Sequence, residues 1–247
     1  MINEAAATGW SEPVRTDLIA TVRAELARAG DPERAAAQQR YMKSAMPFHG
    51  VPMAQVRAIA RAAVASHPIP TAAQWEATIR ALWDQAARRE ERYAAIAIAR
   101  HPVFAPFRTP AALELYRHLV TTGAWWDHVD EIAAHLVGEV LRAEPVVVEP
   151  VLSALATDED MWLRRTAILA QLRSREHTDT TLLAHSLSAN LEGSRHGGEF
   201  FIRKAIGWAL REYAKTDSDW VRAFLTEHAA RLSPLSVREA SKHLPGR

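Results

Sequence analysis

One stretch of sequence decides the fold: EFFIRKAIGWALREYAK, at residues 199–215. Successive residues of an α-helix lie about 100° apart around its axis. Ile202, Ile206 and Leu210 therefore form one apolar stripe, which Tyr213 extends. A helix with such a stripe buries it against neighbouring elements. The stretch predicts a helix that packs into a helical core.

Helical segments with short links follow one another along the rest of the chain. Many begin at a capping residue or Pro and end at Gly or just before Pro. No window alternates convincingly like a strand. The expected helices cover residues 31–43, 53–66, 71–87, 89–100, 109–123, 125–142, 145–156, 160–174, 179–190, 199–215 and 218–230, and two more are opened by Ser11-Glu12-Pro13 and by Ser233-Pro234.

These helices suggest a repeating architecture. Pairs of them recur at roughly 35 to 40 residues, the range of HEAT-type helical repeats. We therefore predict an all-α fold, a superhelical stack of antiparallel helix pairs (a HEAT-like repeat solenoid) with a concave face. We expect it to form a single domain over residues 1–247.

The composition bounds the class of protein. The 247 residues include no Cys, which excludes a disulfide framework and a thiolate metal site, and the net charge is only +1. Residues 1–10 lack the features of a signal peptide, and no uncharged apolar run approaches the roughly 20 residues of a membrane span. The His residues show no metal-ligand spacing with a supporting acid, and no P-loop occurs. We expect a cytoplasmic protein that uses neither a metal nor a cofactor.

The run Trp125-Trp126-Asp127-His128-Val129-Asp130 carries the first candidate site. Residues four apart share a helix face, so Trp126 and Asp130 are expected to be neighbours at the rim of the core stripe. An indole face beside a carboxylate suits a cation, or positive charge that develops during a reaction. The alternative is that both Trp residues belong to the core and both Asp residues cap or pair at a helix start.

Trp208 lies roughly 200° around its helix from Ile206, away from the apolar stripe. Its neighbours at helical spacing are Lys204, Arg211 and Lys215. Aromatic and basic side chains on one face are the expected footprint of a nucleic-acid contact. The alternative is that a second neighbouring helix buries Trp208.

Two further charged features require an explanation. Arg165 projects among apolar residues of the expected helix 160–174, where its guanidinium needs a carboxylate or phosphate partner. It could form a structural salt bridge with Asp130 or Asp127, or it could clamp a phosphate. The charge run from Arg88 to Arg92 is most simply a solvated helix face.

Several motifs, in order along nearly the whole chain, resemble those of one known family. They are RYMK (40–43), PFHGV (47–51), LWD (82–84), WWDHVD (125–130), WLRRTAIL (162–169), EFFIRKAIGWALREYAK (199–215) and PLSVREASKH (234–243). On these motifs the sequence resembles the DNA alkylation-repair glycosylases of the AlkD type, which are built from HEAT-like repeats.

The resemblance nominates site residues one by one. In that family an Asp and two Trp residues form the active surface, with an Arg and a Tyr close by. The Asp falls on Asp130, the two Trp residues on Trp126 and Trp208, the Arg on Arg165 and the Tyr on Tyr41. All five residues are present, and the three that would be catalytic are Asp130, Trp126 and Trp208.

The expected DNA contacts follow from the same comparison and from the helix faces. The sequence departs from the family at Arg164 and Arg203, which stand where uncharged polar residues are frequent, and in a longer loop before Glu199. These departures concern DNA binding rather than chemistry. The expected DNA-binding residues are Arg165, Arg164, Tyr41, Lys204 and Arg211.

The resemblance implies a monofunctional glycosylase that releases cationic N3- or N7-alkylated purines, such as 3-methyladenine and 7-methylguanine, from duplex DNA without flipping the base. Asp130 would stabilise the oxocarbenium-like sugar, and Trp126 and Trp208 would add cation–π attraction. We expect a monomeric, nucleoid-associated enzyme. Two alternatives stay open: a non-catalytic module that binds damaged or branched DNA, and a protein–protein scaffold.

Overall fold

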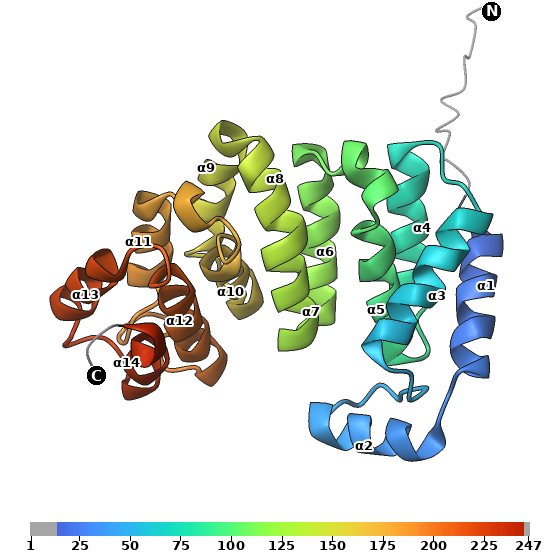
Figure 1. The fold of residues 1–247 in the computed structure, drawn as a ribbon, viewed down its shortest axis with the longest axis horizontal. Coiled ribbons are helices and arrows are strands. Elements are labelled where there is room, and N and C mark those ends of the chain that lie inside the picture. The colour runs from blue at the N-terminus through green and yellow to red at the C-terminus, as the bar shows by residue number, and fades with distance from the viewer. Residues whose placement is uncertain (1–13, 245–247) are drawn as a thin grey trace, which may run out of the picture. The chain divides into compact units, whose positions relative to one another are not determined.

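The structure is a computed structural model that describes residues 14–244, and every regular element in this range is a helix (Figure 1). This confirms the predicted all-α fold, and the succession of helices is consistent with a helical-repeat solenoid. The expected helix start at Ser11-Glu12-Pro13 and residues 1–10 lie outside the described range. The chain divides into two compact units, Met1–Phe107 and Arg108–Arg247. None of the helices in the described range is long and apolar enough to span a bilayer.

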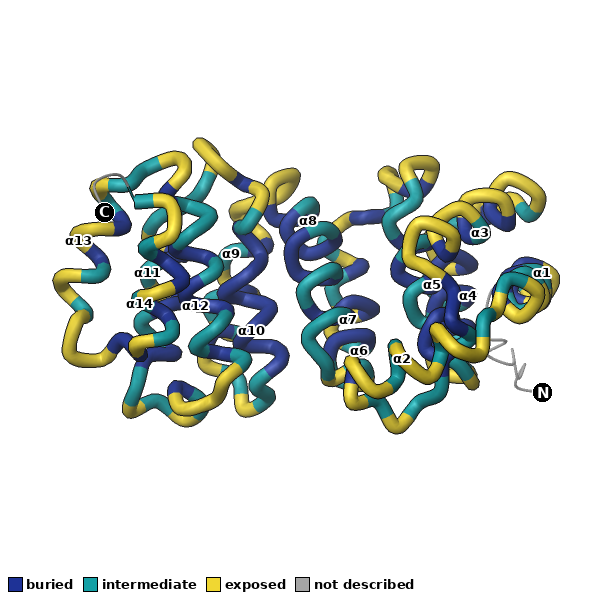
Figure 2. The backbone as a smooth tube through the Cα atoms, turned by 60° about the horizontal axis from the view of Figure 1, so that its bottom comes forward, coloured by how far each residue is buried: buried dark blue, intermediate teal, exposed yellow. Residues whose placement is uncertain are grey.

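The N-terminal unit is built around helix α5. Its elements are α1 (Thr16–Arg28), α2 (Pro32–Met42), α3 (Met53–Ser66), α4 (Ala72–Asp84), α5 (Arg89–Ala99) and a 3-10 helix, Pro102–Phe107, which the sequence did not predict. Helix α5 packs against α1, α3 and α4, and its Ile98 is fully buried with Trp75 and Trp83 of α4. Helix α2 is largely exposed and buries Met42 alone (Figure 2).

The charge run Arg88 to Arg92 is not the solvated face that the sequence suggested. Arg89, Glu90 and Glu91 are all buried. The carboxylate of Glu90 accepts hydrogen bonds from the backbone N–H groups of residues 49, 50 and 51, at 2.8, 2.8 and 3.1 Å. The prediction of a solvated face is wrong because carboxylates of this run accept hydrogen bonds from buried backbone N–H groups. A hydrophobic pattern cannot reveal such bonds.

Glu90→Gln is therefore expected to destabilise the N-terminal unit by about 3 kcal/mol, because a neutral amide replaces a charged acceptor and turns an N–H group toward backbone donors. Chemical denaturation would measure the change. Glu33→Gln, at an exposed carboxylate on α2, is the matched control and should leave the midpoint unchanged. Equal stability of the two variants would show that the loop does not depend on Glu90.

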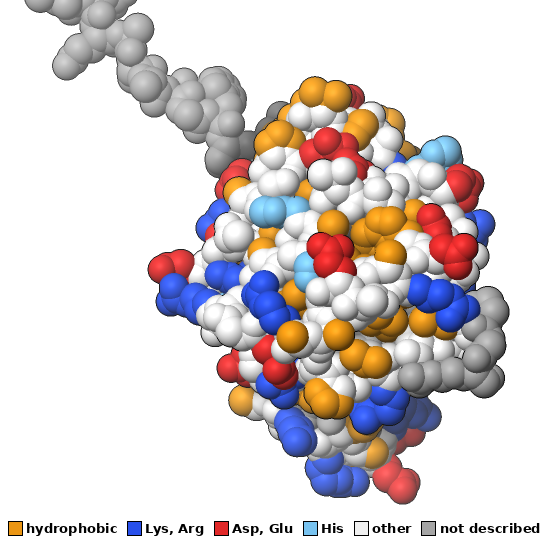
Figure 3. Space-filling model, turned by 90° about the vertical axis from the view of Figure 1, so that its left-hand side faces the viewer, with side chains coloured by type: hydrophobic (Ala, Val, Ile, Leu, Met, Phe, Trp, Pro, Cys, Tyr) orange, Lys and Arg blue, Asp and Glu red, His pale blue; other side chains and the backbone are white. Residues whose placement is uncertain are grey.

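The C-terminal unit holds most of the candidate site residues. Its α-helices are α6 (Leu113–Gly123), α7 (Trp126–Glu131), α8 (Gly138–Ala143), α9 (Pro145–Leu155), α10 (Met161–Leu169), α11 (Thr180–Ser188), α12 (Phe200–Tyr213), α13 (Ser218–Glu227) and α14 (Pro234–Ala240). Short 3-10 helices cover Pro110–Ala112, Arg175–His177 and Ser241–His243. The face drawn in Figure 3 mixes Lys and Arg side chains with hydrophobic ones, and the basic side chains become more frequent toward its lower edge.

Two expected helices differ from the sequence prediction. The one expected at 125–142 contains a π-helical segment, Ile132–Val137, between α7 and α8. Such segments are rare and occur often at functional sites. The helix expected at 160–174 ends as α10 at Leu169, and turns follow as far as Ser174.

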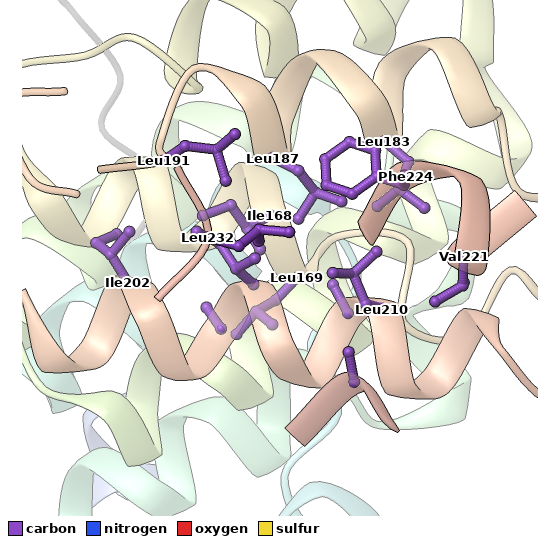
Figure 4. Close-up of a cluster of buried hydrophobic side chains, with 14 of the residues drawn as sticks. Ile168, Leu169, Leu183, Leu187, Leu191, Ile202, Leu210, Val221, Phe224 and Leu232 are labelled. Atoms are coloured by element: carbon purple, nitrogen blue, oxygen red, sulfur yellow. The ribbon is translucent and has the colours of Figure 1, made fainter. Parts of the chain in front are cut away.

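The predicted stripe of α12 is the centre of the core of this unit. Ile202, Ile206 and Leu210 are almost completely buried, and they pack with Leu169 of α10 and Leu187 of α11 (Figure 4). The stripe alone thus placed α12 correctly.

Helix α14 packs closely along α12. Gly207 makes this contact possible, since a Cβ at that position would lie 2.6 Å from Cβ of Glu239 and 2.9 Å from the backbone oxygen of Ser236. Ser236 also donates its hydroxyl to the Arg203 carbonyl at 2.8 Å. A side chain at residue 207 would push α14 away from α12.

Candidate active site

The centre of the candidate site is a two-point ion pair between α7 and α10. Nε and Nη2 of Arg165 donate to Oδ1 and Oδ2 of Asp130 at 2.7 and 2.8 Å. The Arg165 side chain is 3% exposed and that of Asp130 is 14% exposed. The carboxylate therefore has a fixed orientation and still reaches the surface. Of the two interpretations of Arg165, the structure shows the ion pair.

The same guanidinium connects α7 to α12. Its third nitrogen, Nη1, donates to the carbonyl oxygen of Phe201, in the first turn of α12. Helix α10 lies between α7 and α12 and contacts both. One Arg side chain thus connects three helices and also orients Asp130.

An aromatic cluster lies beside this Arg. The ring of Phe201 lies 5.4 Å from Trp125 and 5.1 Å from Trp162 between centroids, and Cζ of Arg165 is 5.9 Å from the Phe201 ring. Phe200 is 59% exposed beside it. Trp125 is therefore packed within this cluster. The cluster lowers the dielectric around the ion pair, which strengthens its electrostatics.

Burial raises the pKa of Asp130 above its ordinary value of 3.8; Arg165 opposes the rise and Asp127 adds to it. The folded protein then holds this proton more tightly than the unfolded chain. Stability from this group is present at low pH and is lost as the pH rises through the folded-state pKa. A carboxylate whose pKa is shifted by burial while a specific charged partner opposes the shift is typical of functional sites.

The two candidate indoles, Trp126 and Trp208, lie on α7 and α12, which Arg165 connects. Trp126 is the first residue of α7, one turn before Asp130, and it is half-buried. Trp208 is two turns after Phe201 on nearly the same side of α12, and it packs against the core while part of it stays exposed. Neither indole is sealed in the core, so both keep some accessible surface.

Arg164 does not fit the expected phosphate contact. It is buried, and its guanidinium donates to the carbonyl oxygens of Thr157 and Asp158 and to Oδ1 of Asn190. These bonds tie the end of α9 to α10 and to the residues after α11. Arg165 likewise uses all its side-chain nitrogens within the protein. The side-chain hydrogen bonds of both Arg residues therefore organise the site.

Lys204 and Arg211 remain partly exposed on α12, at 38% and 24% of their side chains. Both pair with Glu239 of α14, at 2.9 and 2.8 Å. Tyr41 belongs to the N-terminal unit, at the end of α2, where it is 76% exposed. Its exposure leaves it available for an external contact.

Sequence reasoning missed three residues of this arrangement. Phe201 contributes its carbonyl and its ring, Asn190 satisfies Arg164, and Glu239 binds the cations of α12. A backbone carbonyl carries no signal in the sequence. Glu239 lies within the PLSVREASKH motif and could have been suspected as the acid near the cations of α12. In residues 14–244 no group of three or more His, Asp or Glu side chains could hold a metal ion.

Comparisons with known proteins identify the family of the chain. Residues 22–244 match the family described as DNA alkylation repair enzyme. One similar solved structure is named a predicted DNA alkylation repair enzyme from Enterococcus faecalis; it has 33% sequence identity and a TM-score of 0.77, over 88% of this chain and 98% of that chain. A comparison with curated proteins gives no match. The chain belongs to the DNA alkylation repair enzyme family.

Proposed function

We propose that this protein is a monofunctional DNA glycosylase that hydrolyses the N-glycosidic bond of cationic N3- and N7-alkylated purines, among them 3-methyladenine and 7-methylguanine, in duplex DNA. The observation that carries the proposal is the Asp130–Arg165 pair. Both carboxylate oxygens are held at 2.7 and 2.8 Å while the side chain keeps 14% of its surface exposed. A fixed, charged oxygen group at the surface suits a positively charged sugar.

The chemistry begins with the lesion. Alkylation places a positive charge on the base, and the bond between C1′ and the base nitrogen breaks as its electron pair neutralises that charge. The sugar becomes oxocarbenium-like, and the carboxylate of Asp130 stabilises its positive charge. A water oxygen then bonds to C1′ and passes its proton to Asp130 or to solvent. The products are a free neutral base and an abasic site.

The indoles and cations have supporting roles in the proposal. The faces of Trp126 and Trp208 add cation–π attraction of about 0.5 to 2 kcal/mol each, depending on desolvation. Lys204 and Arg211 contact backbone phosphates, and Tyr41 contributes a further DNA contact. We propose that the enzyme acts as a monomer and that the base stays in the stack, so that selection rests on the charge and lability of the lesion rather than on a pocket.

The test is to incubate the protein with methylated duplex DNA, to identify the released bases by chromatography and to count the abasic sites. We expect free 7-methylguanine and 3-methyladenine, with one abasic site for each base released. Loss of methyl groups without abasic sites would contradict the proposal. Tight binding of the lesion duplex without base release would favour the alternative of a non-catalytic binding module.

A further inference from the structure

Another buried carboxylate lies on α14, the helix that packs along α12. Glu239 of α14 is 4% exposed and sits over Gly207. Its Oε1 accepts from Nζ of Lys204 at 2.9 Å and from Nζ of Lys242 at 2.8 Å, and its Oε2 accepts from Nη1 of Arg211 at 2.8 Å. One acid thus holds three cations, and both of its oxygens are occupied.

Two of the three cations held by Glu239 are neighbours of Trp208. Lys204 lies four residues before Trp208 and Arg211 three residues after it, so that both are its neighbours on the surface of α12. Glu239 reaches both cations because Gly207, next to Trp208, brings α14 close. The carboxylate of Glu239 therefore holds both of the cations that flank the indole.

The cluster keeps a positive surplus. Hydrogen bonds from Lys242 and Lys204 lower the pKa of Glu239 to about 2, so it is ionised throughout the neutral range. One negative charge then faces three positive ones. Ammonium and guanidinium groups carry more N–H donors than these contacts use. Lys204, Arg211 and Lys242 keep between 24% and 47% of their side chains exposed, and their remaining donors can meet phosphate oxygens.

We propose that Glu239 is a positioning residue for DNA binding: it touches no substrate, and it holds Lys204 and Arg211 in a preset geometry on either side of Trp208. The proposal rests on the proposed function above. A flexible Lys or Arg loses conformational freedom when it binds, and a side chain that is already ordered avoids this loss. The preset cations would fix the register of the DNA backbone against the indole.

Charge alone and positioning predict opposite effects for the variant Glu239→Gln. Removal of a negative charge beside three cations should tighten binding to a polyanion. Positioning instead predicts that the half-saturating concentration of a 7-methylguanine duplex rises about tenfold, with a nearly unchanged rate at saturation. Glu212→Gln is the matched control, because Glu212 is also on α12 and pairs with Lys215, at 2.8 Å, rather than with the cations that Glu239 holds. It should leave the half-saturating concentration unchanged or lower it.

A purely structural role would give the same loss in any background. We therefore expect Glu239→Gln to have no further effect once Lys204→Ala and Arg211→Ala are both present, because effects that pass through the same side chains are not additive. Glu239→Asp replaces Glu239→Gln should the latter lose its cooperative thermal unfolding; it keeps the charge and withdraws it by one methylene.

Two results would overturn the proposal: unchanged or tighter half-saturation in Glu239→Gln, or a full tenfold loss in the background that lacks both cations. Fluorescence anisotropy with a duplex that carries a stable abasic-site analogue gives the same comparison without catalysis. If the wild type binds DNA but releases no base, the proposed glycosylase function fails while this test of Glu239 still stands.

Discussion

Asp130→Asn is expected to slow the single-turnover release of 7-methylguanine from duplex DNA by roughly 100- to 1,000-fold, the usual effect of removing a preorganised electrostatic group. The amide keeps the shape of the carboxylate but carries no charge to stabilise an oxocarbenium-like sugar and accepts protons poorly. Binding of the lesion duplex should stay close to that of the wild type, since Asp130 itself repels phosphates. Rapid-quench assays with enzyme in excess would measure the rate.

Glu131→Gln is the matched control for that experiment. Glu131 is the next residue of α7, and its carboxylate lies 3.7 Å from His135 rather than near Arg165. The charge change is the same, so a wild-type rate is expected. Equal rates for the Asn variant and the wild type would remove Asp130 from the mechanism.

Arg165→Ala is expected to have the largest effect on stability, a loss of about 3 kcal/mol or more. Removal of one partner from a buried ion pair leaves the other charge without compensation. The variant also loses the bond to the Phe201 carbonyl, so α7, α10 and α12 lose their common tie. Urea denaturation would measure the free energy of unfolding.

The second consequence of Arg165→Ala is chemical. Arg165 opposes the rise of the Asp130 pKa, so its removal raises that pKa further and shifts excision toward higher pH.

Arg195→Ala is the control, because Arg195 pairs with Glu159 at 3.0 Å on the exposed surface. Such pairs contribute little. A loss of stability no larger than that of Arg195→Ala would show that the tie between the helices is unimportant.

Much of this fold could be predicted from the sequence because the apolar residues that a packed helix buries recur at helical spacing. The stripe Ile202, Ile206 and Leu210 placed α12, and capping residues and Pro placed most helix ends within a few residues. The π-helical segment at Ile132–Val137 could not be predicted, since its residues, apolar apart from His135, fit an ordinary helix equally well.

The candidate site, too, could be predicted from the sequence only in part. The helix angles nominate Trp126 and Asp130 at the rim of one apolar stripe and Trp208 away from the stripe of α12, and the structure leaves each of them partly accessible. The roles of Arg164 and Arg165 could not be read in the same way. A cation on an apolar face demands a partner, but the sequence cannot say whether that partner is a phosphate or, as here, Asp130 and a few carbonyl oxygens.

The burial of charged residues was difficult to predict for the same reason. Glu90 and Glu239 are both acids in charged segments, and both are buried because they satisfy groups distant in the chain. A charge pattern predicts exposure only when no such group lies within reach.

The pH dependence of single-turnover excision tests the central claim most directly, because it follows the ionisation of Asp130 itself. With its pKa raised above 3.8 by burial, the wild-type rate should fall as the pH drops through a midpoint higher than that of an ordinary Asp, while circular dichroism shows the protein still folded. The Asp130→Asn variant should keep a low rate with no such bend. A wild-type rate without the bend, or the same bend in the Asn variant, would contradict the assignment of Asp130 as the group that supports base release.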